Sequence, residues 1–110
     1  MTSPRLMLAV DIGTSGARAG LFDAGAHHLA QARKAYDTHF PQPGWSEQNP
    51  HTVAEAVVEV LREVVAASGA GRALAGIVLS AQMYSILALD PSGAPLSNSL
   101  TWADTRSARL

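Results

Sequence analysis

The sequence predicts a single α/β domain with a mixed β-sheet and packed helices. Three apolar stretches with turn residues between them come first, one strongly patterned helix follows, and further apolar stretches come after it. The 110 residues, 47% of them hydrophobic, are enough to fill one core and too few for two domains. No internal repeat or low-complexity segment interrupts this order.

The first half of the predicted sheet is a set of hairpin-like strands. Residues 6–10 are a short apolar run that ends at an Asp-Ile-Gly-Thr sequence, as is typical of a buried strand. Residues 13–16 predict a tight turn, and residues 17–23 predict a second strand that pairs back on the first. Residues 27–36 predict a third strand, although their periodicity is poor.

The clearest helix is predicted over residues 50–67. Asn49 is a good N-cap with proline at the first helical position, Thr52 and Glu55 offer a competing capping box, and Gly69 supplies a C-terminal stop. Five residues form the apolar stripe that should pack on the sheet: Val53, Val57, Val60, Leu61 and Val64.

The segments around this helix predict a loop and two more strands. Proline and glycine make residues 41–50 a loop, in which Trp45 is expected to anchor the chain on the core. Residues 76–80 and 86–89 are apolar stretches that read as strands, and the Asp-Pro-Ser-Gly sequence at 90–93 predicts a turn. A last extended piece is expected to end near Trp102.

Composition and charge exclude several classes of protein. Eight basic and nine acidic residues give a net charge of −1, which argues against binding nucleic acid or an anionic membrane through bulk charge. The lack of cysteine excludes disulfides, thiolate zinc sites and thiol catalysis, and the four histidines have no metal-ligand spacing and are expected at the surface. No apolar run could span a bilayer and residues 1–5 lack the features of a secretory signal, so we expect a cytoplasmic protein.

The strongest local signal for chemistry is the polar turn at 13–16. Asp11, at the end of a strand, could hold hydrated Mg²⁺, while Gly13, Thr14 and Ser15 would offer backbone and hydroxyl donors to phosphate oxygens. The turn has neither the Gly-Lys ending of a Walker A loop nor the following helix of a dinucleotide site. Taken alone, these residues favour an ordinary hairpin turn capped by Asp11, with Arg18 directed either to phosphate or to solvent.

Two later patches could bind a polyhydroxy ligand. Gln82 and Tyr84 could donate hydrogen bonds to a polyol with Met83 as an apolar wall, or they could simply form a connection that faces water. Trp102 and Asp104 suit the apolar face and hydroxyl edges of a sugar, but taken alone they fit a core tryptophan beside a surface ion pair better.

Taken in order, these patches resemble the amino-terminal part of the FGGY carbohydrate kinase family. The similarity covers nearly the whole chain, and five motifs in register reverse the preference for an ordinary turn at 13–16. Within the family the chain is most similar to gluconate kinases, with xylulose kinases next. The motifs are Asp-Ile-Gly-Thr-Ser at 11–15 with Leu-Phe-Asp at 21–23, Pro-Gly-Trp-Ser-Glu-Gln-Asn-Pro at 43–50, Ser-Ala-Gln-Met at 80–83, Leu-Asp at 89–90 with Gly93, and Trp-Ala-Asp-Thr-Arg at 102–106.

The resemblance implies a ribonuclease H-like domain of the actin, sugar-kinase and Hsp70 superfamily, in which ATP and sugar meet between two such domains. By position, Asp11 would hold Mg²⁺, and the ATP phosphates would be contacted by Gly13, Thr14, Ser15 and Arg18. The sugar would be contacted by Gln82, Met83, Tyr84, Trp102 and Asp104. Many family members carry histidine in place of Tyr84, which puts the identity of the substrate in doubt.

The resemblance also implies that much of the enzyme lies outside these residues. Residues 1–110 would be an incomplete N-terminal domain of an ATP-dependent kinase for a sugar or sugar acid. No general base is expected within them, since that residue should lie beyond Leu110, and the chain alone is expected to be inactive. The expected partners are ATP and the sugar, with a homodimer allowed for the full-length protein and neither nucleic acid nor membrane involved.

Two other classes of function stay open from the sequence. One is a non-catalytic module, derived from a kinase, that binds a sugar or nucleotide without turnover. The other, which the residues favour less, is a ribonuclease H-like nuclease that would pair Asp11 with Glu55 on two metal ions.

Overall fold

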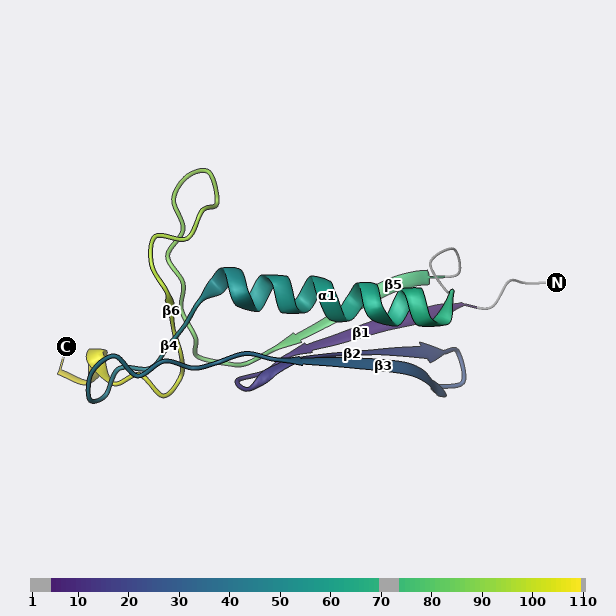
Figure 1. The fold of residues 1–110 in the computed structure, drawn as a ribbon, viewed down its shortest axis with the longest axis horizontal. Helices are drawn as coiled ribbons and strands as arrows, with labels where there is room; N and C mark the ends of the chain where they lie inside the picture. The colour runs from purple at the N-terminus through teal and green to yellow at the C-terminus, as the bar shows by residue number, and fades with distance from the viewer. Residues whose placement is uncertain (1–4, 70–73, 110) are drawn as a thin grey trace.

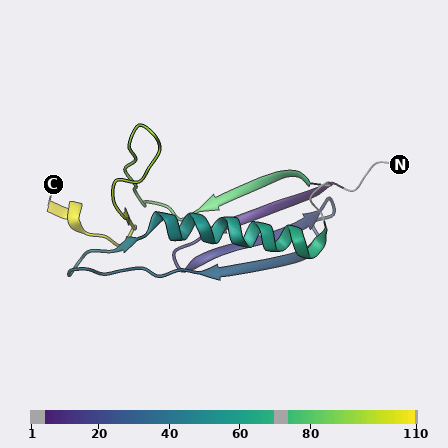
Figure 2. The same cartoon turned by 45° about the horizontal axis from the view of Figure 1, so that its top comes forward.

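The fold is a four-stranded mixed sheet with one long helix lying across one of its faces (Figures 1 and 2). This computed structural model describes residues 5–69 and 74–109. The strands are β1 (Leu6–Ile12), β2 (Gly16–Asp23), β3 (His28–Ala35) and β5 (Leu74–Ala81), in the spatial order β3-β2-β1-β5. The predicted α/β class and its mixed sheet are therefore confirmed.

The order of the strands follows from how they are connected. Short turns join β1 to β2 and β2 to β3, so these pairs are antiparallel. The segment between β3 and β5 contains α1 (Pro50–Ser68), and this crossover returns the chain to the other side of β1, to which β5 runs parallel. The carboxyl end of β1 therefore lies beside both the β1–β2 turn and the end of β5.

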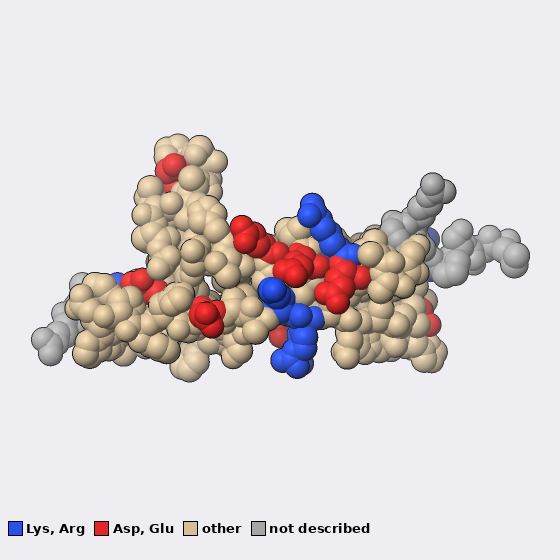
Figure 3. Space-filling view, in the orientation of Figure 1, with Lys and Arg blue, Asp and Glu red and all other residues tan. Residues whose placement is uncertain are grey.

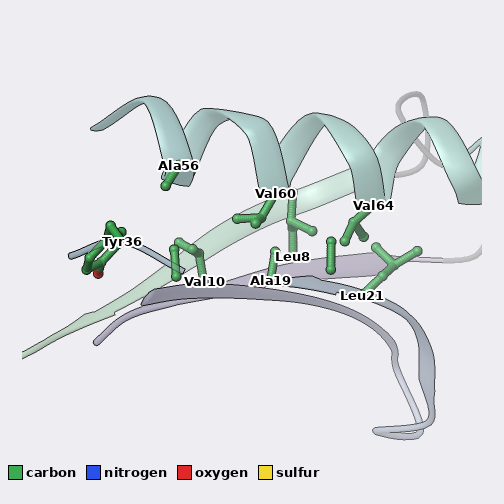
Figure 4. Packing of buried hydrophobic residues seen from close by; sticks show 10 residues of the cluster. Leu8, Val10, Ala19, Leu21, Tyr36, Ala56, Val60 and Val64 are labelled. Carbon is green, nitrogen blue, oxygen red and sulfur yellow. The ribbon is translucent and has the colours of Figure 1, made fainter. Parts of the chain in front are cut away.

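Alternation along the strands divides the sheet into a buried face and an open face. Leu8 and Val10 of β1 and Leu21 of β2 pack beneath Val60 and Val64 of α1 (Figure 4). Because neighbouring residues of a strand point to opposite faces, the residues between these core positions lie on the face away from the helix.

Helix α1 begins and ends at the predicted signals. The side chain of Asn49 accepts a hydrogen bond from the His51 amide at 2.9 Å, and Gly69 caps the other end in the left-handed region with φ of 63°. The outer face is charged, and acidic and basic residues gather over it in the view of Figure 3. Within residues 5–69 and 74–109, no helix is long and apolar enough to cross a membrane.

A small second ladder lies beyond the sheet. Strand β4 (Glu47–Gln48) pairs with β6 (Ser99–Leu100), and a 3-10 helix, η1 (Arg106–Arg109), follows. The predicted strand over residues 86–89 is wrong, because Ile86 and Leu89 form only isolated bridges with Leu100 and Pro95. This segment projects away from the sheet, so its apolar side chains have no sheet face to pack on (Figure 1).

The predicted role of Trp45 as an anchor on the core is also wrong. Its half-buried ring lies under the guanidinium of Arg106, whose central carbon is 4.0 Å from the ring centroid. The core is confined to the space between sheet and helix, and the 41–46 loop lies at the far end beside the small ladder. A cation–π contact thus replaces the expected core packing. The four histidines are exposed, as predicted.

Candidate functional site

The β1–β2 turn forms one side of a small open hollow. The Gly13 amide donates to the Gly16 carbonyl at 2.9 Å, which closes the 13–16 turn. The hollow has a volume of about 230 Å³. It is lined by the turn itself and by Asp11, Ala17, Arg18, Arg33, Lys34 and Ala35.

The carbonyls of this turn are held from the protein side. The Tyr36 hydroxyl donates to the Gly13 carbonyl at 2.5 Å, and Gln48 donates from Nε2 to the Thr14 carbonyl at 2.7 Å. The Tyr36 amide donates to the Ser15 carbonyl at 3.2 Å. Three successive carbonyls therefore face the protein, and the amides of Thr14 and Ser15 donate to no acceptor among the described residues. Backbone N–H groups presented in this way can bind an anion.

Gln82 belongs to the support of this turn. Its Nε2 donates to Gln48 Oε1 at 2.9 Å, and its Oε1 accepts from the Thr14 hydroxyl at 3.3 Å. Its backbone amide, just after β5, donates a hydrogen bond to the Ile12 carbonyl at 2.9 Å. The predicted sugar-contacting side chain is thus engaged in linking the end of β5 to the turn.

Trp102 is brought to the same turn from the far end of the chain. Its Nε1 donates to the Thr14 hydroxyl at 3.1 Å, while 58% of the residue stays exposed. The alternative of a core tryptophan is therefore wrong. An exposed indole face now lies beside the turn.

Met83 and Tyr84 lie outside this network. They are 70% and 86% exposed, and Tyr84 has a φ of 61° in the left-handed region. None of the hydrogen bonds among the described residues uses their side chains, so the structure places them at the surface just after Gln82 without drawing them into the hollow.

Asp104 forms an ion pair with Arg106, as the residues taken alone favour. Its side chain is only 4% exposed, and both of its oxygens accept hydrogen bonds from Arg106, with the Ser46 amide adding a further bond at 2.8 Å. The planar guanidinium and the carboxylate match in shape, so both carboxylate oxygens are used within the protein. A sugar bound by Asp104 would have to share these oxygens with Arg106.

The same arginine joins the small ladder to η1. Arg106 also donates to Glu47 of β4 at 2.7 Å, and the hydrogen bonds that it donates hold the pKa values of Asp104 and Glu47 below their usual range. The two carboxylates in turn raise the pKa of Arg106. The segment that carries Trp102 is thereby fixed to β4, next to Gln48.

Asp11 has the chemistry of a magnesium ligand. It lies exposed at the end of β1 and lines the hollow with the turn. Mg²⁺ prefers carboxylate, phosphate and water oxygens, and it commonly uses one or two carboxylates together with substrate phosphates. In the described part of the chain, no three His, Cys, Asp or Glu residues gather as a complete metal site, so a bound ion would take its other ligands from phosphate and water.

The electrostatic influence of Asp11 extends to Tyr36. Burial raises the pKa of this phenol, and the charge of Asp11 raises it further. The Tyr36 hydroxyl therefore keeps its proton and donates it to the Gly13 carbonyl.

The nuclease alternative is not supported by this arrangement. Asp11 lines the hollow at the open end of β1, whereas Glu55 is exposed on the outer face of α1 among other helix residues. The two carboxylates are not brought together, as a shared pair of metal ions would require.

Sequence reasoning missed the side chains that support the turn and two cations beside it. Tyr36 and Gln48 were predicted only as part of a strand and a loop, and Arg33 and Lys34 as part of a strand. The one available signal was Gln48, which stands in the Pro-Gly-Trp-Ser-Glu-Gln-Asn-Pro motif.

Comparisons with known proteins agree with this architecture. Residues 6–110 match the model of the FGGY family of carbohydrate kinases, N-terminal domain. A glycerol kinase of Gloeobacter violaceus is 39% identical over 105 residues, which are 94% of this chain and 21% of that protein. The chain therefore spans about a fifth of the length of the curated relatives it matches.

Solved structures of the same family share the fold. A xyloylose (xylulose) kinase from Brucella ovis matches with a TM-score of 0.89 and 36% identity, over 94% of this chain and 22% of that one. A gluconate kinase from Lactobacillus acidophilus matches with a TM-score of 0.85 and 28% identity, over 94% and 20%. The expected ribonuclease H-like, sugar-kinase fold is confirmed, and the chain belongs to the FGGY family of carbohydrate kinases, within its N-terminal domain.

Proposed function

We propose that the chain is the N-terminal part of an ATP-dependent kinase that phosphorylates a hydroxyl group of a small polyhydroxy compound. One observation carries this proposal. Tyr36 and Gln48 hold carbonyls of the 13–16 turn, and the amides of Thr14 and Ser15, beside Asp11 and Arg18, have no acceptor among the described residues. Free donors, a cation and an exposed carboxylate in one hollow suit a magnesium-bound phosphate chain.

In this proposal the turn binds the phosphates of ATP. The Thr14 and Ser15 amides and the Ser15 hydroxyl donate to phosphate oxygens, and Arg18 adds a guanidinium from the start of strand β2. Gly13 leaves the backbone open to close approach. Asp11 would hold Mg²⁺, which when bound neutralises charge on the phosphates.

The acceptor side of the site would lie beyond the turn, where Trp102 is exposed. Its indole offers an apolar face to the carbons of a polyol, and Met83 and Tyr84 would close on the ligand from the surface after β5. Gln82 and Asp104 act in this proposal mainly by positioning the turn and the Trp102 segment, since both side chains are engaged within the protein.

Gluconate, xylulose and glycerol are the three candidate acceptors of the phosphoryl group. The motif resemblance favours gluconate, then xylulose, whereas glycerol kinases stand among the most similar relatives in sequence. The exposed indole beside the turn is compatible with each of them, because all three carry carbon-bound hydrogens that can pack on the ring and hydroxyls that can donate hydrogen bonds.

We further propose that residues 1–110 form an incomplete N-terminal domain and that a second domain supplies the remaining groups. The general base that takes the proton of the attacking hydroxyl would lie outside these residues, so that the isolated chain would be inactive. Phosphoryl transfer depends on placing that hydroxyl in line with the γ-phosphate, which takes both sides of a cleft. ATP as a substrate favours a cytoplasmic location, and a homodimer of the intact protein stays a prediction.

The test is an ADP-release assay on the intact protein as its source makes it. Glycerol, xylulose and gluconate are each supplied with Mg-ATP, and a reaction without acceptor gives the background. The proposal expects ADP release well above background with at least one acceptor. ATP binding without ADP release for any polyhydroxy acceptor would favour the non-catalytic module, and no ATP binding at all would overturn the proposal.

A further inference from the structure

Two arginines face each other across neighbouring strands next to the 13–16 turn. Arg18 of β2 and Arg33 of β3 are direct partners in the antiparallel register, and both are exposed. Each lies next to an alanine of the core, Ala19 or Ala32, so both side chains lie on the sheet face away from α1. The pair therefore lies beside the turn on the open side of the sheet.

The two guanidiniums form no ion pair with a carboxylate among the described residues. Asp11 is the strand partner of Arg18 on the other side, and Glu63 of α1 borders an adjoining hollow with both arginines, yet neither forms a salt bridge with them. Like charges directly opposite in a sheet are destabilising. An anion bound between the Arg18 and Arg33 side chains would neutralise both charges and remove their repulsion.

The hollow beside the turn contains both arginines together with other donors. Arg18 and Arg33 line it along with Thr14 and Ser15, whose amides donate to no acceptor in the part of the chain that the structure describes. Lys34 lines it too, but its ammonium lies 3.7 Å from Glu59 of α1 and so has a partner of its own.

We propose that Arg33 is an anion-binding residue that forms, with Arg18, a phosphate subsite next to the 13–16 turn. A guanidinium binds a phosphate through two parallel N–H groups, and two opposed guanidiniums can together bind the dianionic end of a phosphate chain. The ligand is a phosphoryl oxyanion, which the terminal phosphate of a nucleotide and a phosphorylated product share. This inference rests on the proposed function for the identity of that ligand and not for the site itself.

The experiment compares three variants of the intact protein. Arg33→Gln removes the charge, and Arg33→Lys keeps the charge without the forked guanidinium. Arg62→Gln is the control, because it removes an exposed charge of α1 that does not line the hollow. Affinities for ATP, AMP and inorganic pyrophosphate are measured by titration calorimetry, and the thermal midpoint of each variant is measured without ligand.

The inference expects Arg33→Gln to weaken ATP and pyrophosphate binding about ten-fold or more, the effect of losing a charge-assisted contact. AMP binding should change little, since AMP lacks the distal phosphates. Arg33→Lys should fall between the wild type and Arg33→Gln, and Arg62→Gln should match the wild type. Without ligand, the thermal midpoint of Arg33→Gln should be equal to or above that of the wild type, because a like-charge contact is removed. A purely structural role for Arg33 would lower that midpoint and leave the anion affinities unchanged, which would overturn the inference.

The outcomes separate this inference from the proposed function. If ATP binds and turnover occurs but Arg33→Gln binds ATP as tightly as Arg62→Gln does, the subsite is wrong and the kinase proposal stands. If pyrophosphate binding depends on Arg33 while no acceptor yields ADP, the subsite stands and the kinase proposal fails. If the wild type binds none of the phosphate ligands, the subsite is wrong.

Discussion

The orientation of the 13–16 turn is set by two buried side chains distant from it in sequence, Tyr36 and Gln48. Gln48 is only 1% exposed, and its amide joins the Thr14 carbonyl, the Thr38 hydroxyl and the Gln82 side chain. Each of these partners would lose a hydrogen bond if the amide were removed. A buried polar group left without a partner costs more than the bond itself contributed.

Replacing Gln48 with leucine should therefore destabilise the intact protein by about 1–3 kcal/mol. Urea unfolding measures the change, and Gln42→Leu, in an exposed loop position, is the matched control. The Gln48 variant should also bind ATP more weakly, because the Thr14 carbonyl is then free to rotate toward the ligand. Equal stability of the two variants would show that the glutamine does not hold the turn.

At the scale of single elements, α1 shows how one capping residue is chosen over another. The sequence offered both Asn49 and the Thr52–Glu55 pair, and the structure begins the helix at Asn49, with proline next. Because the helix begins after Asn49 and not after Thr52, it gains about one turn at its N-terminal end, directly after Gln48.

Asn49→Ala should lower the free energy of unfolding by about 1 kcal/mol, the usual cost of losing an N-cap. Thr52→Ala, in contrast, should change it by only a few tenths, since the helix already continues through that position. Chemical denaturation of both variants in parallel decides between the two caps. A larger loss for Thr52→Ala would place the start of the helix later than described.

The ladder of β4 and β6 depends on charge. Hydrogen bonds from Arg106 lower the pKa values of Asp104 and Glu47 in the folded state. Folding then favours the ionised carboxylates, so this contribution to stability is fully present above their unfolded pKa values of about 4 and is lost as pH falls through the lower folded values.

We expect the unfolding free energy to fall as pH decreases from about 5 toward 3 and to change little from this source at higher pH. Asp104→Asn removes one of the two titrating groups, so its stability should depend less steeply on pH in that interval. Unfolding curves at a series of pH values test this. An unchanged slope in the variant would contradict the lowered pKa of Asp104.

The sequence predicted the elements that carry strong local patterns. The first three strands, α1 with its caps and the strand after it all stand within a few residues of their expected places, because alternation, helical periodicity and capping residues act locally. The 86–89 strand failed because an apolar run becomes a strand only where a partner strand is available, and here the chain leaves the sheet. The two-residue strands of the small ladder are too short to leave a pattern.

The candidate site was predictable only in part for the same reason. The turn and Asp11 stand in one short motif, which marks them as a candidate site. Taken alone that motif favours an ordinary hairpin turn, and only the resemblance to the kinase family reverses the preference. Tyr36 and Gln48 reach the turn through tertiary contacts, which no local pattern in the sequence predicts. Tyr36 is 23 positions from Gly13 in the sequence, and Gln48 is 34 positions from Thr14. The local sequence did favour an ion pair at 102–106, and the contact between Asp104 and Arg106 confirms it. The assignment of Asp104 to a sugar came only from the resemblance and stays a prediction.

At the scale of the whole molecule, the fold gathers distant segments around the end of β1. Residues from β1, from the ends of β3 and β5, and from the segments containing Gln48 and Trp102 all meet at the 13–16 turn. Helix α1 covers one face of the sheet, and three charged residues of the hollow, Asp11, Arg18 and Arg33, lie on the other face. The sheet therefore lies as a single layer of strands between the core and these three side chains.

Our proposal requires that this end of the sheet binds magnesium and the phosphates of ATP. Titration calorimetry of the intact protein with ATP, in the presence and absence of Mg²⁺, measures this binding. Three proteins are compared: the wild type, Asp11→Asn, and Asp37→Asn as an exposed carboxylate that does not line the hollow. We expect Mg²⁺ to strengthen ATP binding in the wild type and in Asp37→Asn.

In Asp11→Asn this gain should fall by about ten-fold or more, as for the loss of one charged contact, because the carboxylate that would hold the ion is gone. If Asp11→Asn keeps the full gain from Mg²⁺, the assignment of the end of β1 as the metal and phosphate site is contradicted.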